Sequence, residues 1–127
     1  MKSVCPLVSE AYLKLVQFDV YLARRKFSAL HNKVRNCPSG RTLGSADDIG
    51  RVCHAVDVAC IWYFKQVLCL QRSAVTCCLL RRYGVPAELV IGIRKLPFQA
   101  HAWVEVNRQV VNDKTHMPEL FTILDRC

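Results

Sequence analysis

The fold is decided by residues 69–113, which read CLQRSAVTCCLLRRYGVPAELVIGIRKLPFQAHAWVEVNRQVVND. The spacing of their apolar residues predicts a helix over residues 69–83. Gly84 stands where a left-handed C-terminal cap belongs, and Pro86 prevents the helix from continuing. The run at 89–93 is apolar on both faces, which is typical of a buried strand.

Two further strands are expected after this run. Residues 94–99 are predicted to form a loop, residues 100–106 a strand, and residues 110–113 a third strand after a turn at Asn107–Arg108. A helix followed by three neighbouring strands predicts an α+β fold, in which the helix packs on a small antiparallel sheet.

Helices are predicted before this stretch, and the tail after it is ambiguous. Apolar residues at roughly helical spacing predict helix over residues 7–34, with room for one break in the run. Ser45 can cap a second helix that ends near Phe64. The tail can start a helix at Pro118 or form an edge strand at residues 121–124.

The composition indicates a folded protein. The chain has 127 residues, of which 52% are hydrophobic, so it can bury a core. We expect one domain over residues 1–127, with a helical part over 1–64 and the third helix and the strands in 65–127. No apolar run approaches the roughly 18 residues of a membrane span, and the N-terminus lacks the apolar core of a signal peptide. The sequence therefore predicts a cytoplasmic protein.

The net charge indicates which kind of molecule the protein can bind. Its formal value is +8, which suits an acidic peptide or protein partner. Nucleic acid is not expected, because the basic residues are not interleaved with aromatic residues in a recognition motif.

Eight cysteines raise the question of disulfides or metal. No Cys-x-x-Cys pair occurs, so a structural zinc site is poorly supported, and we expect no metal and no cofactor. Disulfides are disfavoured in a reducing cytosol. Most of these cysteines have apolar neighbours and are expected to be small core residues.

Cys69, His101 and Asp113 combine three residue types that can form a nucleophilic site. The positive end of a helix lowers the pKa of a thiol, and Cys69 is the cysteine expected at such a position. His101 opens one predicted strand and Asp113 ends the next. Glu105 lies too far along the strand to orient His101, because four residues span about 13 Å.

The register of the second hairpin decides whether Asp113 reaches His101. A two-residue turn puts Asp113 on the opposite face, whereas a three-residue loop pairs it with His101 directly. We expect the three-residue loop or a bulge near Asn107–Arg108, with a left-handed backbone at Arg108 or an unpaired residue close to it. Trp103 and Glu105 then share the face of His101, which should be turned toward the start of the helix.

Other sets of residues are weaker candidates for a catalytic site. His54 and Asp57, on the second predicted helix, lack a nucleophile that points toward them. Gln66 could donate a hydrogen bond to an oxyanion near Cys69. The three residues of the first group can also be ordinary structural residues: a buried helix start, a hydrogen-bonded strand residue and a turn residue.

Six motifs carry a resemblance to a known family: Cys69-Leu70-Gln71-Arg72-Ser73, residues 79–87 (LLRRYGVPA), Val90-Ile91-Gly92, Pro97-Phe98, Ala100-His101-Ala102-Trp103-Val104-Glu105 and Val111-Asn112-Asp113. Together they resemble the lasso peptide leader peptidases, the B2-type proteins of the microcin J25-processing family within the transglutaminase-like superfamily. The resemblance is dense over residues 69–113 and looser over the first 64 residues.

The resemblance implies a papain-like cysteine protease with a transglutaminase-like core and no cofactor. In it Cys69 is the nucleophile, His101 the base and Asp113 the orienting acid. It implies removal of the leader from a ribosomally made, bacterial lasso peptide precursor. Asn107–Arg108 departs from Asp-Gly, which is frequent in the family, and this bears on the geometry of the hairpin.

The resemblance also implies partners for the chain. In split systems a separate leader-binding recognition protein, of the B1 or PqqD-like type, delivers the precursor peptide. The chain looks like the split form, because it is too short to hold such a domain before Cys69. An ATP-dependent lasso cyclase would then close the ring. The alternatives are a transglutaminase-like acyl transferase or amidase with the same three residues, and a non-catalytic adaptor of this fold.

Overall fold

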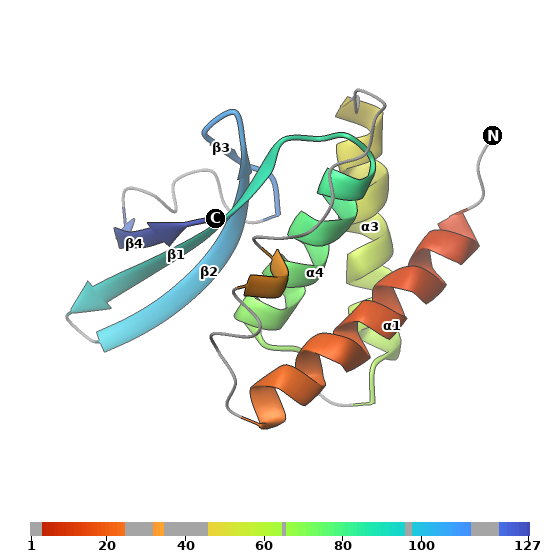
Figure 1. Ribbon diagram of the computed structural model, residues 1–127, viewed down its shortest axis with the longest axis horizontal. Helices are drawn as coiled ribbons and strands as arrows, with labels where there is room; N and C mark the ends of the chain where they lie inside the picture. Colours follow the sequence, from red (N-terminus) through yellow and green to blue (C-terminus); the bar gives the residue numbers. More distant parts are fainter. Residues whose placement is uncertain (1–3, 25–31, 35–45, 65, 96–97, 113–119) are drawn as a thin grey trace.

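The structure, a computed structural model, describes residues 4–24, 32–34, 46–64, 66–95, 98–112 and 120–127 (Figure 1). Its main elements are the helices α1 (Val4–Ala23), α3 (Ala46–Trp62) and α4 (Cys69–Arg82) and the strands β1 (Ala87–Lys95), β2 (Phe98–Val106), β3 (Gln109–Val110) and β4 (Thr122–Arg126). The predicted α+β class is confirmed.

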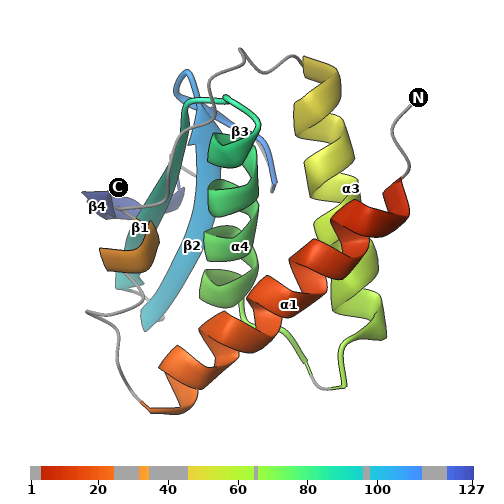
Figure 2. The same ribbon diagram turned by 45° about the vertical axis from the view of Figure 1, so that its right-hand side comes forward.

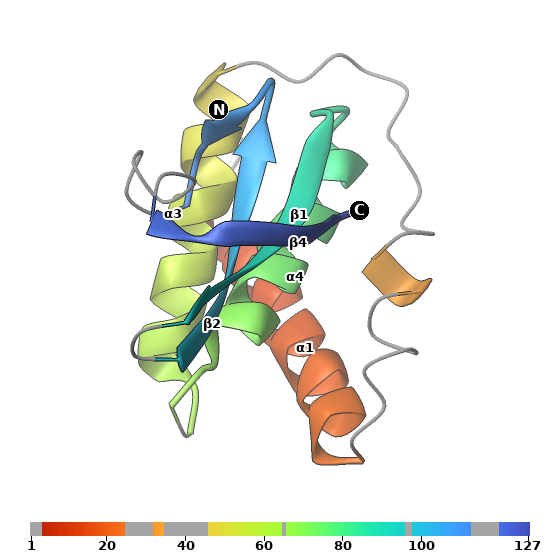
Figure 3. The same ribbon diagram turned by 90° about the vertical axis from the view of Figure 1, so that its left-hand side faces the viewer.

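The elements are arranged in layers around α4. The sheet is antiparallel with the order β3-β2-β1-β4. Figures 1 and 2 show α4 between this sheet and the pair α1 and α3, and Figure 3 looks onto the sheet face that is turned away from the helices. α4 therefore has its neighbours on both sides, which explains why its residues from Ser73 to Leu80 are all buried.

Local signals set both ends of α4. The helix begins at Cys69, as predicted, and Gly84 adopts a positive φ of 81° just beyond its last residue. The Gly84 N–H donates to the carbonyl of Arg81 at 3.0 Å, and the Val85 N–H donates to the carbonyl of Leu80 at 3.0 Å. These bonds satisfy the last helical carbonyls, so the predicted glycine cap is confirmed.

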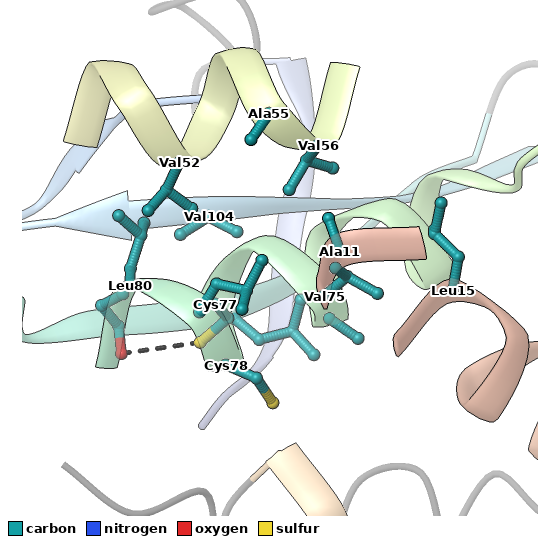
Figure 4. Packing of buried hydrophobic residues seen from close by; sticks show 14 of the residues in the cluster. Ala11, Leu15, Val52, Ala55, Val56, Val75, Cys77, Cys78, Leu80 and Val104 are labelled. Carbon is teal, nitrogen blue, oxygen red and sulfur yellow. Dashed lines mark hydrogen bonds between the residues drawn. The ribbon is translucent and has the colours of Figure 1, made fainter. Parts of the chain in front are cut away.

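The main core lies between α4 and its neighbours. Figure 4 shows Val52 of α3, Cys77 of α4 and Val104 of β2 in one cluster. The Cys77 thiol donates to the carbonyl of Ala87 at 3.7 Å, which links α4 to the start of β1. Cys77 is thus a small core residue, as predicted.

Cys78 corrects the expectation that disulfides are absent. It is disulfide-bonded, and its partner is none of the five described free cysteines, which are Cys53, Cys60, Cys69, Cys77 and Cys127. Sequence spacing could not predict this bond, because pairing depends on which thiols the fold brings together.

The first helix is shorter than the predicted 7–34. α1 ends at Ala23, where the apolar spacing gives way to Arg24-Arg25-Lys26, and residues 25–31 lie outside the described part. In the described part, no helix is both long enough and apolar enough to span a bilayer. Ser45, the predicted cap of the second helix, also lies outside it; that helix, α3, runs from Ala46 to Trp62.

The first hairpin is longer than predicted. Arg94 pairs with Gln99 and Lys95 with Phe98, so the expected loop over 94–99 is mostly strand. Cross-strand pairing extends the ladder beyond the apolar core, and the Arg94 guanidinium donates to the Gln99 side chain at 2.8 Å. The tail forms the edge strand β4, which confirms one of the two alternatives for it.

The second hairpin has a two-residue turn, so the expected three-residue loop is wrong. Val106 pairs with Gln109 and Glu105 with Val110. Asn107 and Arg108 both have positive φ, 52° and 65°, as a tight turn matched to strand twist requires. The left-handed backbone predicted at Arg108 is confirmed, but Asn107 shares it. The paired ladder ends at Val110, and Asp113 lies outside the described residues.

Candidate active site

Cys69 is the first residue of α4, and its side chain is exposed. The preceding Leu68 has an extended backbone and gives the helix no side-chain cap, and the first turn contains no acidic residue. The first-turn N–H groups therefore lack a side-chain acceptor on the helix itself, and the positive end of the helix dipole lies at the thiol.

Cys69 and His101 line the same small pocket. It has a volume of about 100 Å³, and its walls are Cys69, Leu70, Ile91, Ala100, His101 and Ala102. α4 supplies the thiol, and β2 supplies the imidazole. The structure thus brings together two of the three residues predicted for the site.

Two aromatic rings stack on the imidazole of His101. The ring centroid of Trp103 lies 6.2 Å from that of His101, and the centroid of Phe121 lies 5.7 Å from it. The interplanar angles are 30° and 27°, so both rings are stacked on the imidazole. His101 is half-buried, and these contacts restrict its rotation.

Trp103 is fixed by a buried carboxylate that the sequence analysis did not assign to the site. The Trp103 indole N–H donates to Glu105 at 2.8 Å, and the Arg126 guanidinium donates to the other oxygen of Glu105 at 2.6 Å. Burial by itself raises the pKa of Glu105, but the bonds from Arg126 and Trp103 outweigh it and hold the pKa below 4.5. Strand alternation placed Trp103 and Glu105 on one face, and this neighbourhood was the signal for the hydrogen bond between them.

The face of β2 that carries Trp103 and Glu105 was expected to be turned toward the start of α4, and the structure corrects this expectation. Ala102 and Val104 belong to the main core with α4, whereas Trp103 packs with Val90, Val110 and Phe121 in a second cluster. Trp103 and Glu105 therefore lie on the sheet face away from α4, not toward it. His101 shares their ring stack but also borders the Cys69 pocket.

A chain of hydrogen bonds links α4 to β2 one turn beyond Cys69. The Ser73 hydroxyl donates to the carbonyl of Ala102 at 3.0 Å, and the Asn112 amide donates to Ser73 Oγ at 3.1 Å. The Asn112 carbonyl oxygen accepts the N–H of Val104 at 2.8 Å. Nothing in the local sequence predicts this chain, because its members come from three separate segments.

The weaker groupings do not form a second site. His54 is exposed, and Asp57 forms an exposed ion pair with Arg72 at 2.5 Å. Burial and the Asp57 carboxylate raise the pKa of Cys53 to about 11, so its thiol stays protonated at neutral pH. Gln66 is exposed in the segment before α4. Within the described ranges, no group of three or more His, Cys, Asp or Glu side chains is placed to hold a metal ion.

A family model for the transglutaminase-like superfamily matches residues 12–126. This match includes α3, α4 and the whole sheet, and most of α1. The chain belongs to the transglutaminase-like superfamily. In this transglutaminase-like chain, α4 and the sheet, which carry Cys69 and His101, lie wholly within the matched residues.

A curated relative is similar to part of this transglutaminase-like chain. It is the microcin J25-processing protein McjB of Escherichia coli, which is 39% identical over 56 residues. The matched stretch covers 44% of this chain and 27% of the relative, so the similarity spans about a quarter of that protein's length. No solved structure gave a significant match.

The thiols of this transglutaminase-like chain differ sharply in exposure. Among the described free cysteines, Cys69 is exposed, whereas Cys77 is buried and Cys53, Cys60 and Cys127 are intermediate. Burial raises the pKa of Cys77 to about 12. Cys69 is thus the described thiol most accessible to a substrate.

Proposed function

We propose that this chain is a cysteine peptidase that removes the leader from a lasso peptide precursor. The observation that carries the proposal is that an exposed cysteine at an uncapped helix start and a histidine line one pocket. Membership of the transglutaminase-like superfamily supports thiol chemistry, and the similarity to a microcin J25-processing protein supports the substrate class.

The reaction would proceed through a thioester. The Cys69 thiolate attacks the carbonyl carbon of the scissile peptide bond, and His101 gives its proton to the departing amine. Water then attacks the thioester carbonyl while His101 accepts a proton from it. The C–S bond breaks, and the leader leaves with a new carboxylate while Cys69 regains its thiolate.

The start of α4 would stabilise the oxyanion. The backbone N–H of Cys69 is the proposed donor, and the neighbouring first-turn N–H groups add positive potential. One such donor typically contributes about 3 kcal/mol to transition-state stabilisation. Asp113 is proposed to orient His101; the paired ladder ends at Val110, so the two-residue turn does not by itself fix the face on which Asp113 lies. Asp113→Asn should then lower turnover more than it lowers stability.

A transglutaminase-like acyl transferase or amidase is the second candidate, because the family and the thiol are the same. A peptidase and an acyl transferase share the thioester and differ in the group that attacks it, which is water or an amine; an amidase also uses water but releases ammonia instead of cleaving the main chain. If the reaction is run in ¹⁸O-labelled water, a peptidase places the label in the new carboxylate, whereas an acyl transferase joins the acyl group to an amine.

The proposed partners are a precursor peptide, a separate leader-binding protein and a lasso cyclase, acting in the bacterial cytoplasm. The net charge of +8 suits a contact with an acidic partner. Exposed charges are screened beyond about 8 Å at physiological ionic strength, so added salt should weaken this association.

Mass spectrometry of a precursor encoded beside this chain tests the function. The wild-type protein with the leader-binding protein should release the intact leader, whereas Cys69→Ala should not. The Cys77→Ala variant is the matched control, because it removes a thiol from the same helix without touching the pocket. Leader release by Cys69→Ala at the wild-type rate would refute the proposal. Binding of the precursor by the wild-type protein without any cleavage would also refute it and would indicate an adaptor.

A further inference from the structure

The side chain of Gln71 is buried, although it belongs to the first turn of α4. It is 1% exposed and follows Cys69 by two residues. Its amide N–H donates to the carbonyl of Leu15 in α1 at 2.7 Å. Figure 2 shows α1 crossing α4 near the end at which α4 begins. A buried side chain thus joins the start of the helix that carries the thiol to a neighbouring helix.

A second hydrogen bond extends this contact to the end of α3. The Gln71 amide also donates to the hydroxyl of Tyr63, which directly follows α3, and that hydroxyl donates to the Asp19 carboxylate of α1 at 2.8 Å. Burial and the bond to Asp19 raise the pKa of Tyr63 to about 12, so the hydroxyl keeps its proton at neutral pH. We call Gln71, Tyr63 and Asp19 the Gln71 network. It satisfies both amide hydrogens of a buried side chain.

The first turn of α4 has little other support. Leu68 gives it no side-chain cap, and its main-chain bonding starts with the N–H of Arg72, which donates to the carbonyl of Leu68 at 2.9 Å. Helix ends without a cap fray. A side-chain cap would occupy first-turn N–H groups. Gln71 instead holds the turn from the side and leaves these groups available to a substrate.

We propose that Gln71 is a positioning residue for the reaction at Cys69. Through the Gln71 network it fixes the first turn of α4, and with it the thiol and the backbone N–H of Cys69. Donors that are fixed before the reaction stabilise a transition state without having to reorganise. α1 thereby contributes to the geometry of the site, although the pocket is lined by α4 and the sheet. This inference rests on the proposed function, because it assigns a role in the same reaction.

Hydrogen exchange in the variant Gln71→Met tests whether the network holds the first turn. Methionine is unbranched like glutamine but cannot donate a hydrogen bond. The Leu15 carbonyl keeps a partner in its own helix, so the fold should persist. By NMR, the Arg72 amide should exchange roughly tenfold faster or more, because the first turn opens more often. The amide of Tyr83, at the other end of α4, should change by less than about twofold.

Turnover and thiol reactivity separate positioning from a purely structural role. In Gln71→Met, kcat should fall by about tenfold or more while KM stays within about twofold, because the peptide still binds. Alkylation of Cys69 by iodoacetamide, which needs no substrate, should slow by about threefold, because the thiolate loses an ordered helix end. Tyr63→Phe keeps the ring but breaks the link to Asp19, so it should shift both rates in the same direction by less.

Val85→Ala is the matched control. Val85 is buried just beyond the far end of α4. Its truncation should lower the melting temperature of the protein. The exchange of the Arg72 amide, the alkylation of Cys69 and kcat should all stay at their wild-type values.

The outcomes distinguish this inference from the proposed function. Unchanged exchange of the Arg72 amide in Gln71→Met would overturn the inference even if the wild type removes the leader. Faster exchange with unchanged kcat and unchanged alkylation would also overturn it, because the network would then be structural only. Faster exchange and slower alkylation in a protein that removes no leader would support the role of Gln71 and refute the proposed function.

Discussion

The Ser73 hydroxyl of α4 donates a hydrogen bond of 3.0 Å to the carbonyl of Ala102 on β2. Ser73 follows Cys69 by one helical turn, and Ala102 follows His101 directly. This bond therefore joins the element that carries the thiol to the element that carries the imidazole. Asn112 extends the connection, because its amide contacts Ser73 and its carbonyl oxygen contacts Val104.

Ser73→Ala should loosen this junction. It leaves the buried carbonyl of Ala102 and the amide of Asn112 without their partner, at a cost of about 1–3 kcal/mol in the free energy of unfolding. Thr76→Val is the matched control, because the Thr76 hydroxyl bonds only to the carbonyl of Arg72 in the same helix. Urea denaturation of both variants measures the difference; equal losses would show that the junction adds nothing.

Glu105→Gln should destabilise the protein in a pH-dependent way. The folded-state pKa of Glu105 is lowered, so the carboxylate stabilises the fold above its ordinary pKa of 4.5, and this contribution is lost as pH falls through the lower folded value. The variant keeps a partner for the Trp103 indole but leaves the Arg126 guanidinium without the negative charge that it faces in the wild type. We expect a loss of about 2 kcal/mol at pH 7 that shrinks in acid. Urea denaturation of the wild type and the variant at pH 7 and pH 3 measures the loss in the free energy of unfolding. A larger loss at pH 3 than at pH 7 would contradict the prediction.

Gly92→Ala should disturb the ring stack on His101. A Cβ at Gly92 would lie 2.8 Å from the Trp103 ring and 2.9 Å from the Cβ of Phe121, so one of them must move. Overpacking of this kind costs about 1–3 kcal/mol. Gly50→Ala is the control, because a Cβ there meets nothing within 4 Å in α3, and alanine should stabilise the helix by about 0.5–1 kcal/mol. Thermal denaturation should show opposite shifts; a neutral Gly92→Ala would refute the close contact.

Arg108→Gly should stabilise the second hairpin. Arg108 has a φ of 65°, where a side chain is disfavoured, and the change creates Asn-Gly, the preferred sequence of this turn. Relief of the left-handed backbone is worth about 1 kcal/mol. A lower melting temperature for the variant would mean that the Arg108 side chain has a stabilising contact that outweighs the strain.

Local signals explain the parts of the fold that the sequence predicted. Cys69 and Gly84 mark the ends of α4 because capping depends on neighbouring residues alone. The alternation of β2 also follows from local geometry, so the shared face of Trp103 and Glu105 was predicted correctly. The same pattern could not say which face meets α4, since that depends on how the helix packs on the sheet.

One local and one long-range effect explain the errors. The register of the second hairpin was wrong because Arg108 adopts the left-handed backbone that a two-residue turn requires, although it lacks the freedom of glycine. The partner of Glu105 could not be foreseen, because Arg126 reaches it only after β4 pairs with β1. The role of Asp113 stays a prediction.

The thioester on Cys69 tests the central claim most directly. A precursor peptide is mixed with the protein and its leader-binding partner, the reaction is quenched in acid within milliseconds to seconds, and the intact mass and peptide map are recorded. We predict a transient mass increase equal to the leader, located on Cys69, that disappears as leader carboxylate forms and is absent from Cys69→Ala. Leader release without any adduct on wild-type Cys69, together with undiminished release by Cys69→Ala, would contradict the account.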